Sequence, residues 1–336
     1  MNCIIFGGSG FIGTHLAKLI RTTYPEAKIY NLDIATQGEP LPTVKDYKSA
    51  LRDNESHPAT FVQCDVRKPI DFNFSPTDED IIFNFAAVHR TPGHPDYDYF
   101  ETNINGAENV CRFAEKHNIK KIVFTSSISP YGASEDLKSE DSLPTPNTPY
   151  GISKLVAENI HKTWQAGDKS RQLLIVRPGV AFGKGENGNF SRLYNGLKNR
   201  KFAYPGRKDT IKACIYVKDL VKFMLWHLEN SDKGVDIYNC TYEPAYTIEH
   251  ICQSMLKATG MSRSVMLIPI WLIMPAATII GALGAPMGIC PARVRKLMIS
   301  TNICGKKLAD SGYKFTYTFE EALADWYADN DGKCLE

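Results

Sequence analysis

Residues 7–13 read Gly-Gly-Ser-Gly-Phe-Ile-Gly, and this stretch decides the fold of the N-terminal half of the chain. It follows the apolar run Cys3-Ile4-Ile5-Phe6 and precedes apolar side chains that recur at helical spacing. Glycines at positions 7, 10 and 13 permit a tight turn, a close approach of the backbone to a pyrophosphate, and close packing of the helix on the strand. The first N–H groups of the helix would bind the phosphates. The stretch therefore predicts a strand–turn–helix unit that binds a dinucleotide.

Outward from this unit, short apolar runs alternate with amphipathic helical patterns through the first 180 residues. The predicted strands are Asn2–Phe6, Lys28–Leu32, Thr60–Cys64, Asp80–Phe85, Lys121–Thr125 and Gln172–Arg177. This alternation is typical of βαβ units, so we predict an α/β protein with a doubly wound parallel sheet of the Rossmann type. The stretch Pro40–Pro58 has no period and is interpreted as a surface insertion.

The pattern changes after Pro178. A glycine-rich loop (179–189) comes first, followed by a predicted strand at Ala213–Val217 and a helix at Asp219–Leu228. A further strand is predicted at Asp236–Asn239, and a helix, Phe319–Tyr327, near the C-terminus. We predict a cofactor-binding domain of residues 1–180 with about 212–241. A smaller, C-terminal substrate-binding domain takes about 181–211 with 242–336.

Asp33 stands at the end of the second predicted strand, 20 residues after Gly13. A carboxylate at this place can accept hydrogen bonds from the hydroxyls of an adenosine ribose. It would also repel a 2′-phosphate, which favours NAD over NADP. The alternative interpretation is a simple turn residue before Ile34.

A second constellation lies at Tyr150-Gly151-Ile152-Ser153-Lys154. Thr148 is a helix-capping residue and Pro149 suits the first helical position, so Tyr150 and Lys154 would lie one turn apart on one face. A lysine ammonium beside a phenol is expected to lower the pKa of the phenol toward the working range of a general base. The preceding strand ends in Thr125-Ser126-Ser127, whose hydroxyls would meet the same substrate oxygen.

Composition excludes several classes of protein. The chain has 336 residues with 39 basic and 37 acidic side chains, a net charge of +2, which does not suit a nucleic-acid binder. The 9 cysteines include no Cys-x-x-Cys pair, and no metal-binding helix motif occurs, so we expect neither disulfides nor a metal site. The N-terminus has no secretory signal pattern, and we expect a cytoplasmic protein.

The stretch Ser264–Ala292 contains no charged residue and no histidine. Its length alone would allow a membrane span, but Pro269, Pro275 and Pro286 interrupt it. We therefore predict short helices over the substrate-binding domain. Part of their apolar surface is expected to make a peripheral contact with a membrane or a partner through residues 264–292.

With these motifs in place, the chain resembles the extended short-chain dehydrogenases/reductases, in the NAD-dependent epimerase/dehydratase group that acts on nucleotide sugars. The matching pieces occur in family order and cover nearly the whole chain. They are residues 7–13, Asp33, Cys64–Val66, Phe85–Ala87, Thr125–Gly132, Tyr150–Lys154, Val176–Pro178, Gly188–Phe190 and Tyr216–Leu220.

The resemblance implies the roles of the catalytic and cofactor-binding residues. Tyr150 would be the general base that takes the proton of a sugar hydroxyl, and Lys154 would bind the nicotinamide ribose. Ser127 would hydrogen-bond the reacting oxygen. The residues implied to bind NAD are Gly7, Gly10, Phe11, Ile12, Gly13, Asp33, Asp65, Val66, Ala86, Ala87, Tyr150 and Lys154.

The resemblance also implies a set of substrate contacts in the second half of the chain. Asn189 and Phe190 would meet the nucleotide of the substrate. Lys212 stands where many relatives have an arginine near the substrate diphosphate, and Arg293 (or Arg295) is a further candidate for a phosphate contact. A homodimer is implied by resemblance only.

The same resemblance excludes some reactions. Dehydratases of the family carry Asp-Glu after the catalytic hydroxyl residue, whereas Ile128 and Ser129 follow Ser127 here. We therefore expect oxidation and reduction without elimination, as in a C4 epimerase that passes through a transient 4-keto sugar. The alternatives left open are a single-step NAD(P)-dependent oxidoreductase (a 4-keto-sugar reductase or a hydroxysteroid/sterol-type dehydrogenase) and a non-catalytic NAD sensor.

Overall fold

In the computed structural model, residues 1–35, 50–51, 55–89, 94–282 and 291–336 are described. Most of the predicted insertion Pro40–Pro58 lies outside them. Within the described part, seven parallel strands form the central sheet, in the order β12-β7-β5-β4-β1-β2-β3. Their bounds are β1 (Asn2–Phe6), β2 (Lys28–Asp33), β3 (Thr60–Gln63), β4 (Ile81–Asn84), β5 (Lys121–Thr125), β7 (Gln172–Pro178) and β12 (Val235–Cys240). The predicted strands are confirmed to within one or two residues at their ends.

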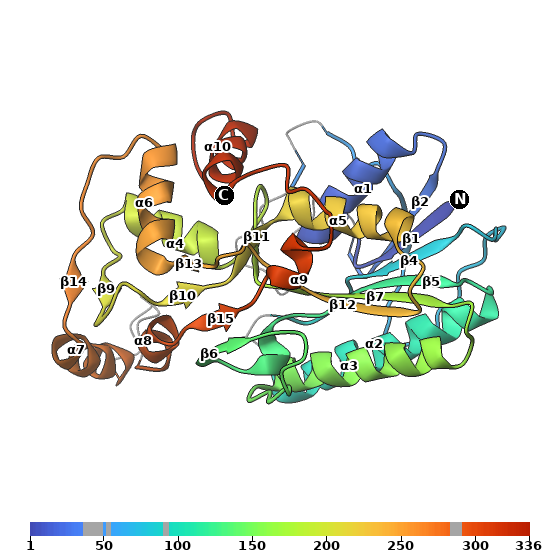
Figure 1. Ribbon diagram of the computed structural model, residues 1–336, viewed down its shortest axis with the longest axis horizontal. Helices are drawn as coiled ribbons and strands as arrows, with labels where there is room; N and C mark the ends of the chain where they lie inside the picture. Colours follow the sequence, from blue (N-terminus) through green and yellow to red (C-terminus); the bar gives the residue numbers. More distant parts are fainter. Residues whose placement is uncertain (36–49, 52–54, 90–93, 283–290) are drawn as a thin grey trace.

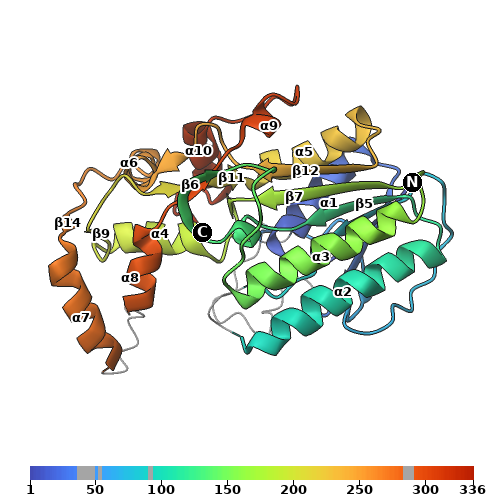
Figure 2. The ribbon, with the colours of Figure 1, turned by 60° about the horizontal axis from the view of Figure 1, so that its bottom comes forward.

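Helices cover both faces of this sheet, as Figures 1 and 2 show. On one face lie α1 (Phe11–Thr23) and α5 (Val217–Asn230), and on the other α2 (Asp96–Lys116) and α3 (Pro149–Ala166). Alternate residues of β1 serve the two cores: Ile5 packs with α1 and α5, whereas Ile4 packs with α2 and α3. A strand buried on both faces reads as a continuous apolar run, which is why β1 shows no alternation. The predicted doubly wound α/β fold is confirmed.

The strand order reverses between β1 and β4. From β1 the chain proceeds outward to β2 and β3, and from β4 it proceeds in the other direction to β5, β7 and β12. Sheets of this type bind their ligands in a crevice at the carboxyl ends of the strands, next to such a reversal. We expect this crevice beside the glycine-rich turn and residues 85–89, which follow β1 and β4.

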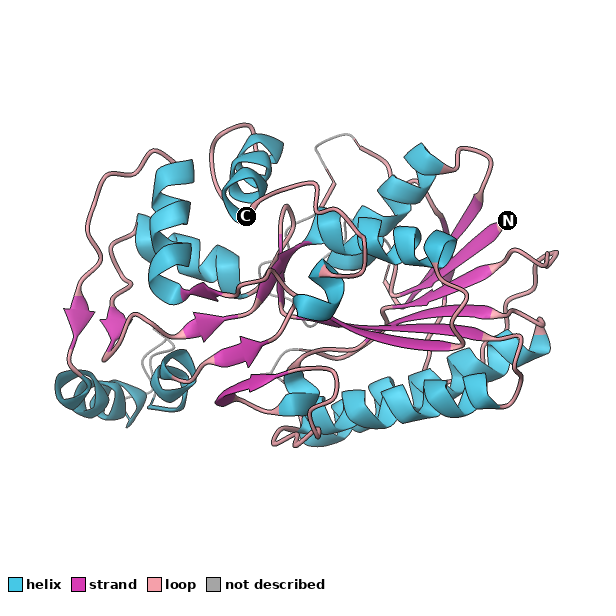
Figure 3. Cartoon of the chain, in the orientation of Figure 1, coloured by secondary structure: helices cyan, strands magenta, loops and turns pink. Residues whose placement is uncertain are grey.

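A second group of elements, formed by segments between β5 and the C-terminus that alternate with β7 and β12, is drawn at the other end of the molecule (Figure 3). Its centre is a four-stranded sheet in the order β13-β10-β15-β6. The remaining strands are β6 (Ser134–Lys138), β8 (Val180–Phe182), β9 (Tyr204–Pro205), β10 (Ile211–Lys212), β11 (Cys214–Tyr216), β13 (Tyr246–Thr247), β14 (Leu267–Ile268) and β15 (Thr301–Ile303). The remaining helices are η1 (Ser129–Tyr131), α4 (Asn189–Lys198), α6 (Ile248–Ala258), α7 (Ile270–Ala282), α8 (Pro291–Met298), α9 (Lys306–Ala309) and α10 (Phe319–Asp329).

The predicted strand Ala213–Val217 is shorter in the structure. It forms β11, which pairs in parallel with β8, and Val217 already begins α5. A second core, which includes the rings of Phe182, Tyr216, Phe319 and Trp326, joins these strands to α4, α6 and α10. In this core the aromatic rings pack together with aliphatic side chains of α6 and α10.

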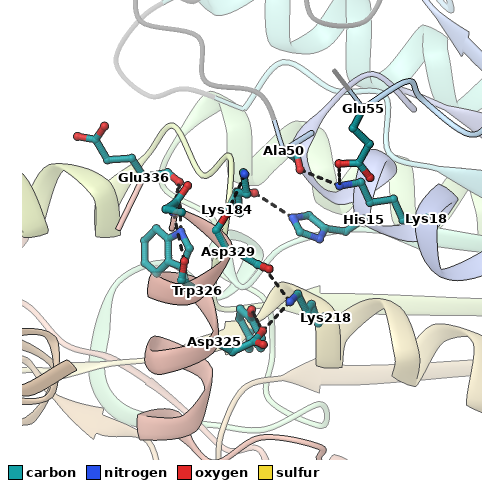
Figure 4. A network of polar contacts seen from close by, with 12 residues as sticks. His15, Lys18, Ala50, Glu55, Lys184, Lys218, Asp325, Trp326, Asp329 and Glu336 are labelled. Carbon is teal, nitrogen blue, oxygen red and sulfur yellow. Dashed lines mark hydrogen bonds and ion pairs between the residues drawn. The ribbon is translucent and has the colours of Figure 1, made fainter. Parts of the chain in front are cut away.

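A polar network fastens the loop before α4 to the first and last helices (Figure 4). The ring Nε2 of His15 lies 2.9 Å from the carbonyl oxygen of Lys184, and the Lys184 ammonium donates to the carbonyl oxygen of Asp329 at 2.9 Å. Lys218 forms ion pairs of 2.6 and 2.7 Å with Asp325 and Asp329. Burial lowers the pKa of His15 to about 4, so the ring is neutral and donates to the carbonyl. The loop that leads to Asn189 is therefore held by both α1 and α10.

The described part of the apolar stretch 264–292 forms β14, the helix α7 and the start of α8, which agrees with the prediction of short helices. Pro275 does not end a helix, as its sequence suggested, but lies inside α7. Across the described ranges of the chain, we find no helix long and apolar enough to cross a membrane. Figures 1 and 2 show α7 and α8 at the end of the molecule away from the central sheet.

Candidate active site

The glycine-rich turn after β1 is closely packed at two positions. Gly7 has a φ of 76°, and a Cβ placed on it would lie 2.7 Å from the backbone nitrogen of Ala86. A Cβ on Gly13 would lie 2.6 Å from the Cα of Gly8. Side chains therefore fit at neither position without movement of the backbone, which brings residues 85–89 and helix α1 directly against the turn.

The N-terminal end of α1 is open to a ligand. Gly10 occupies the N-cap position, and no side chain in the described part of the chain caps this end. The first-turn N–H groups, which begin at Phe11 and Ile12, carry the positive end of the helix dipole. A glycine cradle beside an uncapped helix end fits the pyrophosphate of a dinucleotide, as predicted for residues 7–13.

Asp33 lies half-buried at the end of β2, beside the turn. Its Oδ2 accepts a hydrogen bond from the backbone N–H of Ser9 at 3.0 Å, and its Oδ1 accepts one from Ile34 at 2.7 Å. Burial raises the pKa of this carboxyl group, against the hydrogen bonds that lower it. These hydrogen bonds fit the interpretation of Asp33 as a turn residue. They also fit the predicted ribose contact, because they fix the orientation of the carboxylate beside the turn.

We expect Asp33→Ala to reduce the preference for NAD over NADP by about tenfold or more, because the repulsion between Asp33 and a 2′-phosphate is removed. Titration of both cofactors measures this. Asp33→Asn serves as the matched control: it keeps the size of the side chain and one of the two acceptors but not the charge, and it should reduce the preference for NAD over NADP similarly. NADP affinity equal to that for NAD in the unaltered protein would contradict the assignment.

The other predicted cofactor residues follow β3 and β4, at the same edge of the central sheet. Asp65 follows β3 and forms an ion pair with Arg67, 2.7 Å between Oδ2 and the guanidinium, whose hydrogen bonds lower the pKa of Asp65. Val66 is buried against Gly106 of α2. Ala86 and Ala87 follow β4, with Ala86 directly against the turn.

Helix α3 begins as the sequence predicts. The Thr148 hydroxyl accepts a hydrogen bond from the backbone N–H of Gly151 at 3.1 Å, and Pro149 is the first helical residue. This cap places Tyr150 in the first turn, within hydrogen-bond contact of the Ser127 side chain. The two predicted catalytic hydroxyls are therefore brought together by the end of β5 and the start of α3.

Lys154 lies one turn further along α3 and is buried. Its ammonium donates to the carbonyl oxygen of Thr125 at 2.8 Å and lies 4.8 Å from the centre of the Phe124 ring. The Thr125 hydroxyl is buried and has no hydrogen-bond partner within the described residues. An unpaired hydroxyl beside a buried ammonium suits a polar ligand at this end of β5, as the nicotinamide ribose would be.

In the protein without ligand, the pKa of Tyr150 is not lowered, contrary to the prediction from the sequence for a phenol beside Lys154. Burial raises the pKa of Tyr150 to about 12, and burial lowers the pKa of Lys154 to about 7. The shift of the Tyr150 pKa arises from burial, from Ser127 and from Tyr99, and not from the charge of Lys154. The Ser127 hydrogen bond acts in the direction that the general-base role requires.

Asn103 of α2 connects the crevice loop to α3. Its side chain exchanges two hydrogen bonds with the backbone of Val88, at 2.9 and 3.1 Å, and donates to the Ser153 hydroxyl at 2.8 Å. Ser153 lies between Tyr150 and Lys154 on α3. Asn103 thereby fixes residues 85–89 relative to the predicted catalytic helix.

A buried ion pair behind the site was not predicted. Glu158 of α3 and Arg177 of β7 lie 2.6 Å apart between Oε2 and Nη2, and both are buried. Glu158 also accepts a hydrogen bond of 2.6 Å from Ser126, the neighbour of Ser127. The sequence does contain a signal for it, since Glu158 stands four residues after Lys154 and Arg177 lies in an apolar strand.

The predicted substrate residues divide into different environments. Asn189 is the first residue of α4, after an N-cap with no side-chain cap. Phe190 is buried and stacks on Phe182, 4.9 Å between ring centres, so a contact of its side chain with substrate is a prediction that the packing does not favour. The Lys212 ammonium donates to the carbonyl oxygen of Ile299 at 2.7 Å. The side chain of Arg293 lies outside the described residues, although its backbone belongs to α8.

The fold and this arrangement define an NAD-dependent enzyme of the doubly wound type. The chain belongs to the NAD dependent epimerase/dehydratase family, whose model matches residues 3–241. The predicted family, enzymatic character and cofactor class are thereby confirmed.

Two relatives show the range of 4-epimerases to which the chain is similar. It is 27% identical over 327 residues to the N-acetyl-alpha-D-glucosaminyl-diphospho-ditrans,octacis-undecaprenol 4-epimerase of Escherichia coli O157:H7, covering 96% of this chain and 93% of that one. It is 26% identical over 289 residues to the UDP-glucose 4-epimerase of Bacillus subtilis (strain 168), covering 77% and 83%.

Solved structures show the same fold. The UDP-N-acetylglucosamine 4-epimerase from Methanobrevibacter ruminantium M1, in complex with UDP-N-acetylmuramic acid, matches with a TM-score of 0.72 and 19% identity, covering 99% of this chain and 98% of that one. The UDP-glucose 4-epimerase of Thermus thermophilus, in complex with NAD, matches with a TM-score of 0.70 and 18% identity, covering 99% and 100%.

Proposed function

We propose that this protein is an NAD-dependent C4 epimerase of a nucleotide sugar, a UDP-hexose or UDP-N-acetylhexosamine. The observation that carries the proposal is the contact between Ser127 and Tyr150, with no carboxylate next to it in the chain. Ile128 and Ser129 follow Ser127, and the Ser127 hydroxyl donates to that of Ser129 at 3.0 Å. This site suits proton transfer at one oxygen and lacks the acid–base pair that an elimination would need.

Tyr150, Ser127 and Lys154 have separate roles around the C4 oxygen of the sugar. Tyr150 accepts the proton of the 4-hydroxyl and returns it after the ring has turned over. Ser127 donates a hydrogen bond to the same oxygen, and Lys154 binds the nicotinamide ribose from behind. NAD, held by the turn, α1 and Asp33, supplies the reversible hydride transfer when bound. A transient 4-keto sugar lies between the two epimers.

Two measurements on the purified protein test this function. NAD released by heat denaturation shows that the cofactor is retained, and a panel of UDP-hexoses is then incubated without added cofactor. We expect interconversion of a C4 pair with no net redox change. Turnover only with added NAD(P) or NAD(P)H would instead identify a single-step oxidoreductase, and NAD retention without any turnover would identify a sensor.

A second candidate substrate is the same sugar joined by a diphosphate to a lipid rather than to a nucleotide. The relative that matches over 96% of this chain is named for such a substrate. By the family resemblance, Lys212 stands where many relatives have an arginine near the substrate diphosphate. Incubation with a polyprenyl-diphosphate N-acetylhexosamine in detergent, beside the UDP-sugar panel, distinguishes the two carriers by which one is epimerised.

The proposal includes the predicted division of labour along the chain. Residues 1–180 with about 212–241 would hold the cofactor, and about 181–211 with 242–336 would hold the substrate. A homodimer in the cytoplasm is the assembly expected from the resemblance. Light scattering on the purified protein measures the assembly directly.

A further inference from the structure

We call residues 264–282 and 291–299 the α7–α8 arm; of the predicted site residues it contains only Arg293 and its alternative, Arg295. The sequence from Ser264 to Ala309 contains no Asp or Glu, while Arg263, Arg293, Arg295 and Lys296 lie at the two ends of the apolar stretch. The chain as a whole is nearly neutral, with a net charge of +2. Apolar and cationic residues are therefore concentrated together in the arm.

Several large apolar side chains of the arm are exposed to solvent. Met266 and Trp271 are each 70% exposed, and Leu272 is also exposed. These side chains cluster at the start of α7, where β14 pairs with β9 and ties the arm to the body of the protein. On α8, Leu297 and Arg295 are exposed as well. Proteins that stay free in water rarely expose large apolar side chains in such a group, and groups of this kind are typical of interaction sites.

The dimensions of α7 limit what a binding partner of the arm can be. Its 13 residues span about 20 Å at 1.5 Å per residue, less than the ~30 Å hydrocarbon core of a bilayer. The helix can therefore enter a membrane only partway, parallel or oblique to its surface. Trp side chains favour this interfacial region because one end of the ring is apolar and the other donates a hydrogen bond.

The charges of the arm select among the possible occupants. A second copy of the chain would bring two cationic arms together, with no acidic side chain in either stretch to compensate. The headgroups of anionic lipids supply the opposite charge next to an apolar phase. The arm matches such a surface in both respects.

We propose that the α7–α8 arm docks this protein peripherally on an anionic lipid bilayer. Met266, Trp271 and Leu272 enter the interfacial layer, and the exposed Arg295 of α8 contacts the headgroups. Ile299, at the end of the arm, accepts the hydrogen bond from Lys212. Docking thus holds the predicted diphosphate-binding residue close to the membrane face. The proposal goes beyond the epimerase reaction and does not depend on it.

Co-sedimentation with vesicles tests the proposal. We expect the protein to bind vesicles of phosphatidylglycerol and phosphatidylcholine, and to bind pure phosphatidylcholine more weakly by about fivefold for each basic side chain in contact. Salt at ~1 M should reduce binding to the mixed vesicles toward the level of the neutral ones. A blue shift of the Trp271 fluorescence, absent in Trp271→Phe, should accompany binding.

Paired variants locate the contact. The double variant Trp271→Ser/Leu272→Ser should lose at least about tenfold in vesicle affinity, because two exposed apolar side chains no longer leave water. Leu143→Ser is the matched control, since Leu143 is 80% exposed but lies in the loop before α3, and its vesicle affinity should not change. Retained NAD and an unchanged thermal midpoint show that each variant is folded.

Three results would overturn the proposal. One is absence of the unaltered protein from the vesicle pellet, and another is equal pelleting of the double variant. The third is a dimer that becomes monomeric in the double variant and does not bind vesicles, which would assign the arm to a second copy. None of these three measurements depends on epimerase activity. A failure of the docking proposal can therefore be distinguished from a failure of the proposed function.

Discussion

Replacing Tyr150 with Phe is expected to lower turnover by about 10²–10⁴-fold while NAD remains bound. The substitution removes only the phenolic oxygen, and with it the group that accepts the proton of the sugar hydroxyl. The packing of the ring beside Tyr99 is kept, 6.3 Å between ring centres. Turnover is measured with the UDP-sugar that the panel identifies, and retained NAD is measured by heat release.

The matched control is Tyr97→Phe, which removes a phenol from an exposed position of α2 and should leave turnover unchanged. A loss smaller than about tenfold in Tyr150→Phe would assign the general base to another group. Lys154→Ala gives a different pattern, since it should weaken both turnover and NAD retention. The two variants together separate proton transfer from cofactor binding.

Short-range patterns in the sequence were sufficient to predict the central sheet. Each strand that is buried on both faces is an apolar run of four to seven residues bounded by turn residues, and such runs are visible without knowledge of the partner strands. Strand β6 (Ser134–Lys138) was missed for the opposite reason. Its sequence, Ser-Glu-Asp-Leu-Lys, is polar and charged, and it is a strand because it pairs at the edge of the second sheet with β15, far along the chain.

In the candidate site, too, local features could be predicted from the sequence, whereas contacts between distant segments could not. The glycine turn, Asp33 and the Tyr150–Lys154 pair depend on contacts between near neighbours or on backbone conformation, and the sequence predicts where they lie. The environment of Phe190 and the hydrogen bond of Lys212 to Ile299 depend on the packing of distant segments. The pKa directions of Tyr150 and Lys154 likewise depend on burial, which spacing along one helix does not contain.

The buried ion pair behind the site leads to the largest expected effect on stability. Glu158→Gln should lower the free energy of unfolding by about 3–5 kcal/mol, because the Arg177 guanidinium then stays buried without a compensating charge. The amide keeps the shape of the side chain and a carbonyl acceptor for Ser126, so the effect reports mainly the charge. Chemical denaturation at a fixed NAD concentration measures it, since bound cofactor itself adds stability.

Two further variants decide whether the effect arises from the pairing. Glu108→Gln removes one partner of the exposed pair with Arg112 on α2, 3.5 Å between nitrogen and oxygen, and should change stability by less than about 1 kcal/mol. Glu158→Leu/Arg177→Met removes both buried charges and should cost much less than the sum of its single variants. Additive costs would mean that Glu158 and Arg177 stabilise the fold independently, and that the ion pair does not fix Ser126 and Ser127 relative to α3.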